Sequence, residues 1–198
     1  MLSTLVFVLF VVPLALSSET VSVRPRSSSS FPIYFGYGSN LLKERLERSV
    51  KATRMGIGKI KDYRLDFDYF SKRWNGSVAT IVPDSEREVW VAIWRIPKGG
   101  FKKIDKQEGV AENVYKRFKV NVEMPDGNTI NGYTYMLTKN PDRYIPLNQL
   151  PNARQPSKSY MDVIVKGAEE SGLPTFYQDM LKSVSHNDYD GQVHYELS

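Results

Sequence analysis

The stretch "YFGYGSNLL", from Tyr34 to Leu42, places two glycines, a serine and an asparagine between an aromatic segment and a leucine-rich one. A glycine-rich turn from a strand into a helix presents main-chain N–H groups at the helix N-terminus, where they attract carboxylates and phosphates. Gly36 and Gly38 let the chain bend and let a ligand approach the backbone. A plain turn with a helix cap explains the pattern equally well, and no P-loop lysine or dinucleotide fingerprint accompanies it. The stretch alone predicts no more than a site for a small anion.

A single glutamate is the candidate general base. The stretch "GGFKKIDKQEGV" predicts a short helix with Phe101 and Ile104 on one face and Gly109 at its end. Glu108 then lies in the last turn, near the negative end of the helix dipole, which raises the pKa of a carboxyl group, and burial raises it further. Asp105 could share its face, as one pairing among many. From the physics alone, an exposed glutamate that tolerates a small cost is the simpler explanation.

The composition excludes several kinds of active site. The chain has no cysteine, which removes thiol nucleophiles, thiolate-bound zinc and iron–sulfur clusters. Its two histidines, His186 and His194, lie near the C-terminus at a spacing that suits no common metal motif. A Ser-His-Asp triad and a metal site are therefore not expected. Whatever the protein does has to be done with backbone groups, carboxylates and aromatic side chains.

The charge balance identifies no macromolecular partner. The net charge is +5 and the sequence pI is about 9.2, a balance that could favour anionic surfaces or substrates. However, basic and acidic residues alternate throughout, and no long basic stripe interleaves with aromatic residues. A mixed, solvated surface is the better interpretation, and nucleic-acid binding is not expected.

The N-terminal residues are typical of an exported protein. Residues 2–16 form an uncharged apolar run, and the "ALS" at its end fits the pattern that signal peptidase cleaves. We predict a signal peptide over 1–18, a flexible polar lead-in over 19–30 and one domain over 31–198, so the protein is expected to be secreted. The run is short for a membrane span, so no stable membrane association is expected. A signal anchor is the alternative, because no Lys or Arg precedes the run.

The elements on either side of the glycine-rich turn follow from their hydrophobic patterns. Residues 31–37 read as a short buried strand that the glycines end. Residues 41–50 are predicted to form a helix with its leucines on one side, which Asn40 or Ser39 would cap.

Strands are expected to dominate the middle of the chain. Residues 63–70 alternate apolar and polar side chains, which predicts a strand with one buried and one exposed face, and 77–82 is a short β-branched strand. Residues 88–96 are apolar on both faces, as a central strand is. Residues 113–137 predict a hairpin with its turn at 126–127.

The last third of the chain is predicted to be a loop followed by helices. The proline-rich stretch 139–157 is unsuited to a helix or a central strand, so we expect a long loop. Helices are predicted over 160–172 and 174–184. The order of elements predicts an α+β domain around a strongly antiparallel, barrel-like sheet.

Taken together, the motifs resemble a known family. "YFGYGSNLL" followed by "IDKQEGV" is similar to γ-glutamylcyclotransferase of the animal type. The similarity continues through "WNGSVATIV", "EVWVAIWRI", "PSKSY", "KGAEESGLPTFYQDML" and "NDYDG", in order, over nearly all of Tyr34 to Gly191. Asn40 after "YGS" distinguishes the chain from glutathione-degrading relatives with "YGSL" and from γ-glutamylamine-specific relatives with "YGTL".

The resemblance implies a fold, a reaction and a site. The family fold is a small mixed, mostly antiparallel β-barrel flanked by helices, and its members are often homodimers. Its enzymes cyclise γ-glutamyl-amino acids to 5-oxoproline and release the free amino acid, without metal or cofactor. Glu108 matches the catalytic glutamate, which serves as general acid and base. The substrate-binding positions that match are Tyr34, Phe35, Gly36, Tyr37, Gly38, Ser39, Asn40 and Tyr160, with Tyr115 as a further lining residue.

Some features depart from the family pattern or leave an alternative open. Most animal members have no signal peptide, the proline-rich loop is longer than usual, and Asn75 begins a glycosylation sequon. A tyrosine at a helix start, such as Tyr160, also suits a core. The competing function is a secreted, catalytically silent binding protein of the same fold. The intact Glu108 and "YGS" argue against it, because a decayed site loses its general base first.

Overall fold

The computed structural model describes residues 31–193. The predicted signal peptide, the lead-in and His194 lie outside the described residues. Within residues 31–193, no helix is long and apolar enough to cross a membrane.

A closed barrel of five strands forms the centre of the domain, in the order β1-β3-β2-β4-β5. Parallel pairing of β1 with β5, at Tyr34 and Tyr133, closes the barrel, and the other pairs are antiparallel. This confirms the predicted α+β class with a mixed, mostly antiparallel barrel. The strands are β1 (Ile33–Gly36), β2 (Thr53–Ser71), β3 (Gly76–Arg95), β4 (Tyr115–Glu123) and β5 (Thr129–Leu137).

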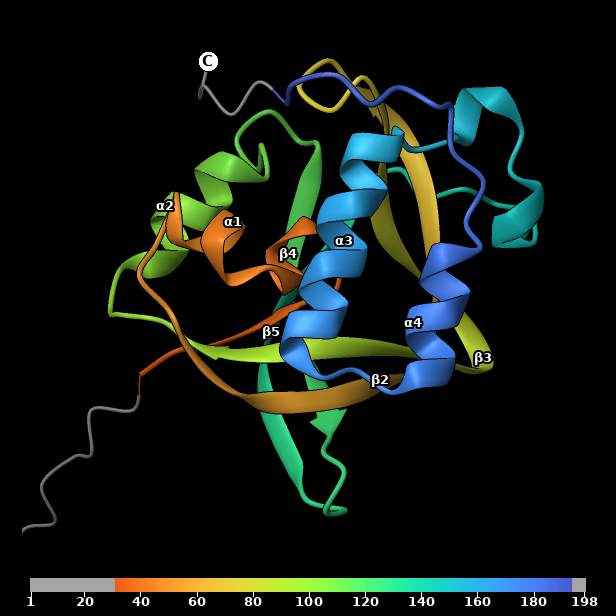
Figure 1. Cartoon of the computed structure of the whole chain (residues 1–198). Helices are drawn as coiled ribbons and strands as arrows, with labels where there is room; N and C mark the ends of the chain where they lie inside the picture. Colours follow the sequence, from red (N-terminus) through yellow and green to blue (C-terminus); the bar gives the residue numbers. More distant parts are fainter. Residues whose placement is uncertain (1–30, 194–198) are drawn as a thin grey trace, which may run out of the picture. The chain divides into compact units, whose positions relative to one another are not determined.

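Helices cover one side of this barrel (Figure 1). The helix α3 packs against α4 and against β3. Ser157 caps α3 by accepting a hydrogen bond from the main-chain N–H of Tyr160, and Gly172 ends the helix in the left-handed region at φ 73°. The α-helices are α1 (Lys43–Glu47), α2 (Gly100–Gln107), α3 (Lys158–Ser171) and α4 (Thr175–Lys182), and the 3₁₀ turns are η1 (Ser39–Leu41), η2 (Leu147–Gln149) and η3 (Asn152–Arg154).

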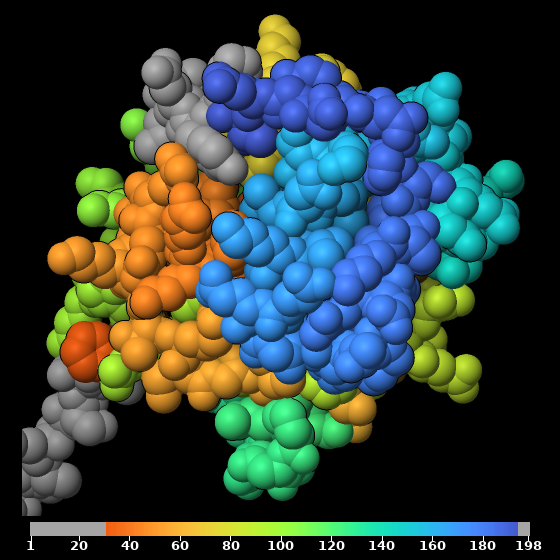
Figure 2. Space-filling view, viewed as in Figure 1, coloured from red at the N-terminus to blue at the C-terminus, as the bar shows by residue number. Residues whose placement is uncertain are grey.

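The C-terminal segment beyond α4 runs across the N-terminal end of α3 (Figure 2). The main-chain N–H of Ser159 donates to the carbonyl of Tyr189 at 3.1 Å, and the hydroxyl of Ser159 donates to the carbonyl of Gly191 at 2.8 Å. Tyr160, a predicted site residue, lies in this first turn of α3, so the C-terminal segment fixes the part of the helix that carries it.

The middle strands are longer than predicted. The separate strands predicted over 77–82 and 88–96 form one continuous strand, β3, and β2 begins ten residues before the predicted start at 63. Three register shifts between β2 and β3 explain the difference, because bulges bend a long hairpin enough to curve around a barrel. The predicted hairpin of β4 and β5 is confirmed, with Gly127 in the left-handed region at its turn.

The prediction of one exposed face for 63–70 was wrong. Arg64 and Asp66, on the predicted exposed face, are both buried, while Tyr69, on the predicted buried face, is 50% exposed. Asp66 forms ion pairs with Arg64 and with Arg154, which belongs to the proline-rich loop. The loop covers the polar face of β2, and the buried carboxylate is tolerated because both guanidinium groups pair with it.

The predicted helix over 41–50 is much shorter, and neither Asn40 nor Ser39 caps it. The residues at the N-cap positions of η1 and α1 are Gly38 and Leu42, without a side-chain capping bond. The turn is tight, because a Cβ added to Gly36 would lie 2.8 Å from the main-chain oxygen of Asn40. The Asn40 side chain is therefore available for a different role.

Candidate active site

Glu108 lies at the C-terminal end of α2, as the sequence predicted. Its main-chain N–H donates to the carbonyl of Ile104 at 2.8 Å, and Gly109, at φ 62°, turns the chain away from the helix. Glycine at this position adopts the left-handed conformation without strain, so the helix ends directly after the glutamate.

Two amide side chains hold the carboxylate of Glu108. Gln107 Nε2 donates to Glu108 Oε1 at 2.9 Å, and Asn40 Nδ2 donates to the same oxygen at 3.2 Å. Asn40 Nδ2 also donates to the hydroxyl of Tyr34 at 2.8 Å, and Asn40 Oδ1 accepts from Gln107 Nε2 at 3.2 Å. Among residues 31–193, no donor reaches Glu108 Oε2. One oxygen is thus fixed, and the other keeps its lone pairs for a ligand.

The Gln107 amide is oriented by its own neighbours. Its Oε1 accepts hydrogen bonds from Arg45 NH1 at 3.0 Å and from the Ser49 hydroxyl at 2.5 Å. The nitrogen of the amide must then point toward Glu108. These contacts connect α1 and the turn after it to the carboxylate, so the short helix has a defined function in positioning the site.

Burial raises the pKa of the Glu108 carboxyl above its ordinary value. The positive charges of Arg45 and Arg73, and the hydrogen bonds from Gln107 and Asn40, oppose this rise without cancelling it. A raised pKa makes the carboxylate a stronger proton acceptor near neutral pH, which is the property that a general base requires.

Buried tyrosines line the same space as the carboxylate. The Tyr160 hydroxyl accepts from the main-chain N–H of Ala79 at 3.2 Å, and the Tyr115 hydroxyl donates to the Ala79 carbonyl at 2.7 Å. The Tyr37 hydroxyl donates to the carbonyl of Tyr135 at 2.8 Å. Burial raises the pKa values of Tyr37, Tyr115 and Tyr160, so these phenols stay neutral and are fixed in place.

Two adjoining spaces meet at Glu108. We call the smaller one, of about 30 Å³, the inner pocket; it is lined by Tyr34, Tyr37, Gly38, Ser39, Asn40, Ala79, Glu108, Tyr115, Tyr135 and Tyr160. We call the larger one, of about 740 Å³, the outer cavity; it is lined by Ser39, Arg45, 69–74, Val78, 106–109, Glu112, Val114, Tyr115 and Tyr160. Ser39, Glu108, Tyr115 and Tyr160 line both, so the carboxylate lies at their junction.

Most predicted site residues come together at the inner pocket. Of the positions predicted to bind substrate, those that line it are Tyr34, Tyr37, Gly38, Ser39, Asn40 and Tyr160. Phe35 and Gly36 line neither space. The Phe35 side chain is fully buried in the barrel core, where Gly132 leaves room for its ring, and Gly36 makes the tight turn possible.

The sequence did not single out the residues that surround these. Gln107 could have been found from its place beside Glu108, but nothing distinguished Arg45 within its charged helix. Arg45 is only 5% exposed, and its guanidinium lies over the ring of Trp74 at 5.9 Å. Arg73 lies in the turn between β2 and β3, where basic residues are ordinary.

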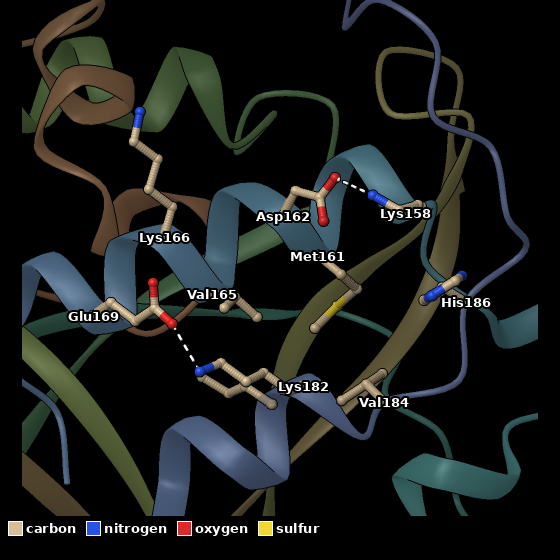
Figure 3. Close-up of a pocket in the computed structure, with 10 residues that line it drawn as sticks. Lys158, Met161, Asp162, Val165, Lys166, Glu169, Lys182, Val184 and His186 are labelled. Carbon is tan, nitrogen blue, oxygen red and sulfur yellow. Dashed lines mark hydrogen bonds and ion pairs between the residues drawn. The ribbon is translucent and has the colours of Figure 1, made fainter. Parts of the chain in front are cut away.

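A further cavity of about 270 Å³ lies between α3 and α4 (Figure 3). Four of its charged side chains form two ion pairs, with Lys158 Nζ 2.7 Å from Asp162 and Lys182 Nζ 2.7 Å from Glu169. It shares no residue with the Glu108 site. In the described part of the chain, no three His, Cys, Asp or Glu side chains gather as a metal site requires.

Comparisons with known proteins show which proteins this chain is similar to. The model of the AIG2-like family matches residues 88–181. The chain is 36% identical to mouse gamma-glutamylcyclotransferase, over 83% of this chain and 85% of the relative. The bovine gamma-glutamylcyclotransferase is also 36% identical, over 88% of this chain and 89% of the relative.

The chain belongs to the γ-glutamylcyclotransferase family. Among solved structures, one of a gamma-glutamyl cyclotransferase superposes with a TM-score of 0.74 and 33% identity, covering 84% of this chain and 95% of that one. Similarity of this extent makes the protein a cyclotransferase enzyme, and the resemblance seen in the sequence motifs is confirmed.

Proposed function

We propose that this enzyme cyclises γ-glutamyl-amino acids to 5-oxoproline, with Glu108 as the general acid and base. The observation that carries the proposal is the position of the Glu108 carboxylate. It lies at the junction of the inner pocket and the outer cavity, one oxygen is held by two amides, and burial raises its pKa. The relatives named gamma-glutamylcyclotransferase supply the substrate class.

The reaction is an internal displacement. The substrate's α-nitrogen attacks its γ-carbonyl carbon, a carbon–nitrogen bond closes the five-membered ring, and the bond from that carbon to the amino acid's nitrogen breaks. Overall, the α-ammonium nitrogen loses two protons and the leaving nitrogen gains two, so the reaction consumes no acid or base. Glu108 takes protons from the α-nitrogen and returns them to the leaving nitrogen. The enzyme's other task is to hold the substrate in a bent, reactive geometry.

We assign the γ-glutamyl group to the inner pocket. The loop from Tyr34 to Ser39 lines it together with Asn40, and the loop's main-chain groups lie within reach of a small anionic or carbonyl group. The neutral hydroxyls of Tyr115 and Tyr160 border the same space. Polar groups that are fixed before the substrate arrives need no reorganisation as charge develops on the carbonyl oxygen.

The silent binding protein is the less favoured function. It would be supported by a proline-rich loop that fills the site or by a Glu108 side chain turned outward. Among the described residues, none from 139–157 lines either space, and Glu108 lines both. Both observations support turnover over the binding function.

The test is release of 5-oxoproline from γ-glutamyl-alanine. We expect turnover by the full chain and a loss of about 10²- to 10⁴-fold in kcat for Glu108→Gln, which keeps the shape but removes the proton acceptor. Glu169→Gln makes the same change in the cavity between α3 and α4 and serves as the control. Activity that survives in Glu108→Gln would assign catalysis elsewhere. Folded wild-type protein without activity on any γ-glutamyl-amino acid would favour the binding function.

We further propose that the protein is secreted and that it works as a homodimer. The signal peptide predicted over 1–18 supports the first, and the resemblance to a family whose members are often homodimers supports the second. Expression of the full chain in a secreting host, followed by N-terminal sequencing and light scattering of the protein in the medium, tests both. Retention in cells with an intact N-terminus would contradict secretion, and a monomeric mass would contradict the dimer.

A further inference from the structure

Arg73 has a cationic side chain without a partner in the part of the chain that the structure describes. It is half-buried and lines the outer cavity. No ion pair or hydrogen bond joins its guanidinium to another of residues 31–193, in contrast to Arg64 and Arg154, which both pair with Asp66. A partly desolvated guanidinium without a partner is costly, so an anionic ligand would stabilise it.

The charges around Arg73 reinforce this expectation. Four cationic side chains line the outer cavity, namely Arg45, Lys72, Arg73 and Lys106, against the two carboxylates Glu108 and Glu112. The NH1 group of Arg45 already donates to Gln107, and Lys72 and Lys106 are exposed. A concave surface with an excess of positive charge concentrates anions, and Arg73 is the half-buried cation among these four.

The arrangement of the inner pocket and the outer cavity indicates where the leaving amino acid of the substrate would bind. If the γ-glutamyl group occupies the inner pocket and the scissile bond lies at Glu108, the leaving amino acid extends into the outer cavity. Every such amino acid carries an α-carboxylate next to its nitrogen. An arginine can bind a carboxylate through two parallel hydrogen bonds, which fixes orientation as well as charge.

We propose that Arg73 binds the α-carboxylate of the leaving amino acid and so selects γ-glutamyl-amino acids over γ-glutamylamines. This inference rests on the proposed function, because it assumes that the γ-glutamyl group binds in the inner pocket. It assigns selectivity for the leaving group to a residue outside the "YFGYGSN" and "QEG" motifs.

Arg73 also influences Glu108, and the test has to separate the two effects. The positive charge of Arg73 lowers the pKa of the Glu108 carboxyl, although the effect of burial is larger. Removing the charge would therefore change the pH dependence for every substrate. A ratio of kcat/KM values for two substrates, measured on one variant at one pH, cancels this contribution and any loss of folded protein.

The experiment compares γ-glutamyl-alanine with γ-glutamyl-alaninamide, which differ only in the carboxylate. We expect the wild-type full chain to prefer the acid and Arg73→Gln to reduce the acid-to-amide ratio by about 10- to 100-fold, the value of a hydrogen-bonded charge pair. Arg73→Lys keeps the charge without the paired hydrogen bonds and should give an intermediate ratio. Lys72→Gln removes the same charge from the neighbouring exposed residue and should change the ratio less than about twofold.

Each remaining outcome contradicts a definite part of the inference. An unchanged ratio in Arg73→Gln would overturn the role of Arg73 while leaving the proposed function intact. An equal drop in Lys72→Gln would show that the general charge of the cavity, rather than Arg73, selects the acid. Absence of 5-oxoproline release from either substrate by folded wild-type protein would overturn the proposed function and this inference together.

Discussion

The inner pocket and the outer cavity share Glu108 but are built in different ways. The inner pocket is bounded by buried tyrosines whose hydroxyls bond to main-chain groups, to Asn40 or to Asp105. The outer cavity is bordered by exposed side chains, among them Tyr69 at 50% and Phe70 at 58% exposure. Under the proposed function, the γ-glutamyl half of the substrate, which is the same in every substrate, meets the fixed groups, and selection of the leaving group falls to side chains with more freedom.

The origin of the residues explains this division. The inner pocket is assembled from β1, the turn after it, β3, the end of α2, β4, β5 and α3, elements that meet only because the barrel closes. The rim of the outer cavity comes largely from one hairpin end, 69–74. A register shift between Asp68 and Phe70, with Tyr69 at φ 57°, disrupts the ladder there. A bulge of this kind redirects side chains next to an active site.

After the loss of Glu108 itself, the largest effect is expected when the inner pocket loses its donor amide. Asn40→Asp keeps the shape but places a second carboxyl group where Asn40 Nδ2 now lies, 3.2 Å from Glu108 Oε1. Two adjacent carboxyl groups share a proton, which raises the apparent pKa of the pair, and the hydrogen bond from the amide to the carboxylate is lost, so kcat/KM at pH 7 should fall about 10- to 100-fold. In the pH profile of kcat/KM, the acid limb should shift to higher pH.

The matched control for this change is Asn131→Asp, the same substitution at an exposed position on β5. It should leave the profile in place. An Asn40→Asp enzyme with the wild-type acid limb would mean that the proton transfers do not depend on this contact.

A smaller loss is expected for Tyr160→Phe. The substitution removes the hydroxyl that accepts from the Ala79 N–H, and it leaves this buried donor without its partner. We expect kcat/KM to fall about tenfold, the value of one hydrogen bond, with a lower Tm. Tyr144→Phe, which removes an exposed hydroxyl, is the control. If both variants behave alike, the inner wall contributes shape only.

A substitution in the outer cavity should change the selectivity among leaving amino acids rather than kcat. Phe70→Ala removes a half-exposed apolar surface from the rim, so KM for γ-glutamyl-leucine should rise about threefold while KM for γ-glutamyl-glycine stays the same. Phe176→Ala, at an exposed residue that packs against Trp90, provides the comparison. A fall in kcat for both substrates would contradict the inference that the outer cavity affects selectivity without affecting the rate of the reaction.

The smallest effect is one of stability, and its sign follows from the raised pKa of Glu108. The folded state binds a proton more tightly than the unfolded chain, so stability falls as the pH rises above the unfolded carboxyl pKa of about 4.3 toward the folded value. Glu108→Gln should therefore have a Tm a few degrees above wild type at pH 7, and the difference should vanish at pH 4.

Glu123→Gln tests that sign in the opposite direction. Lys61 lowers the pKa of the Glu123 carboxyl, so this carboxylate stabilises the fold above its unfolded pKa and loses the effect as the pH falls. Removing it should lower Tm at pH 7 slightly. Thermal unfolding of both variants across the pH range gives the comparison, and a Glu108→Gln protein less stable than wild type at pH 7 would contradict the interpretation.

Much of the site could be predicted because its signals are local. Gly109 ends α2 directly after Glu108, and Asp126-Gly127 marks a hairpin turn, since both depend on backbone conformations that few residues adopt without strain. The order of motifs from Tyr34 to Gly191 was sufficient to indicate the family, because it records many positions at once.

The predictions that were wrong concern residues whose partners lie far away in the sequence. Asn40 fits a helix-cap pattern, yet its amide serves Glu108, 68 residues away, because the barrel brings β1 and α2 together. Arg64 and Asp66 alternate like solvent-facing residues, yet the proline-rich loop buries them through Arg154.

The sequence by itself therefore determined the local turns, the helix that carries Glu108 and the family to which the chain belongs. Only the tertiary structure decided which polar groups are buried and paired and which, like Arg73, still lack a partner among the described residues. The physical reason is that conformational preference is a property of a few neighbouring residues. Desolvation and charge pairing depend on every element packed around a group.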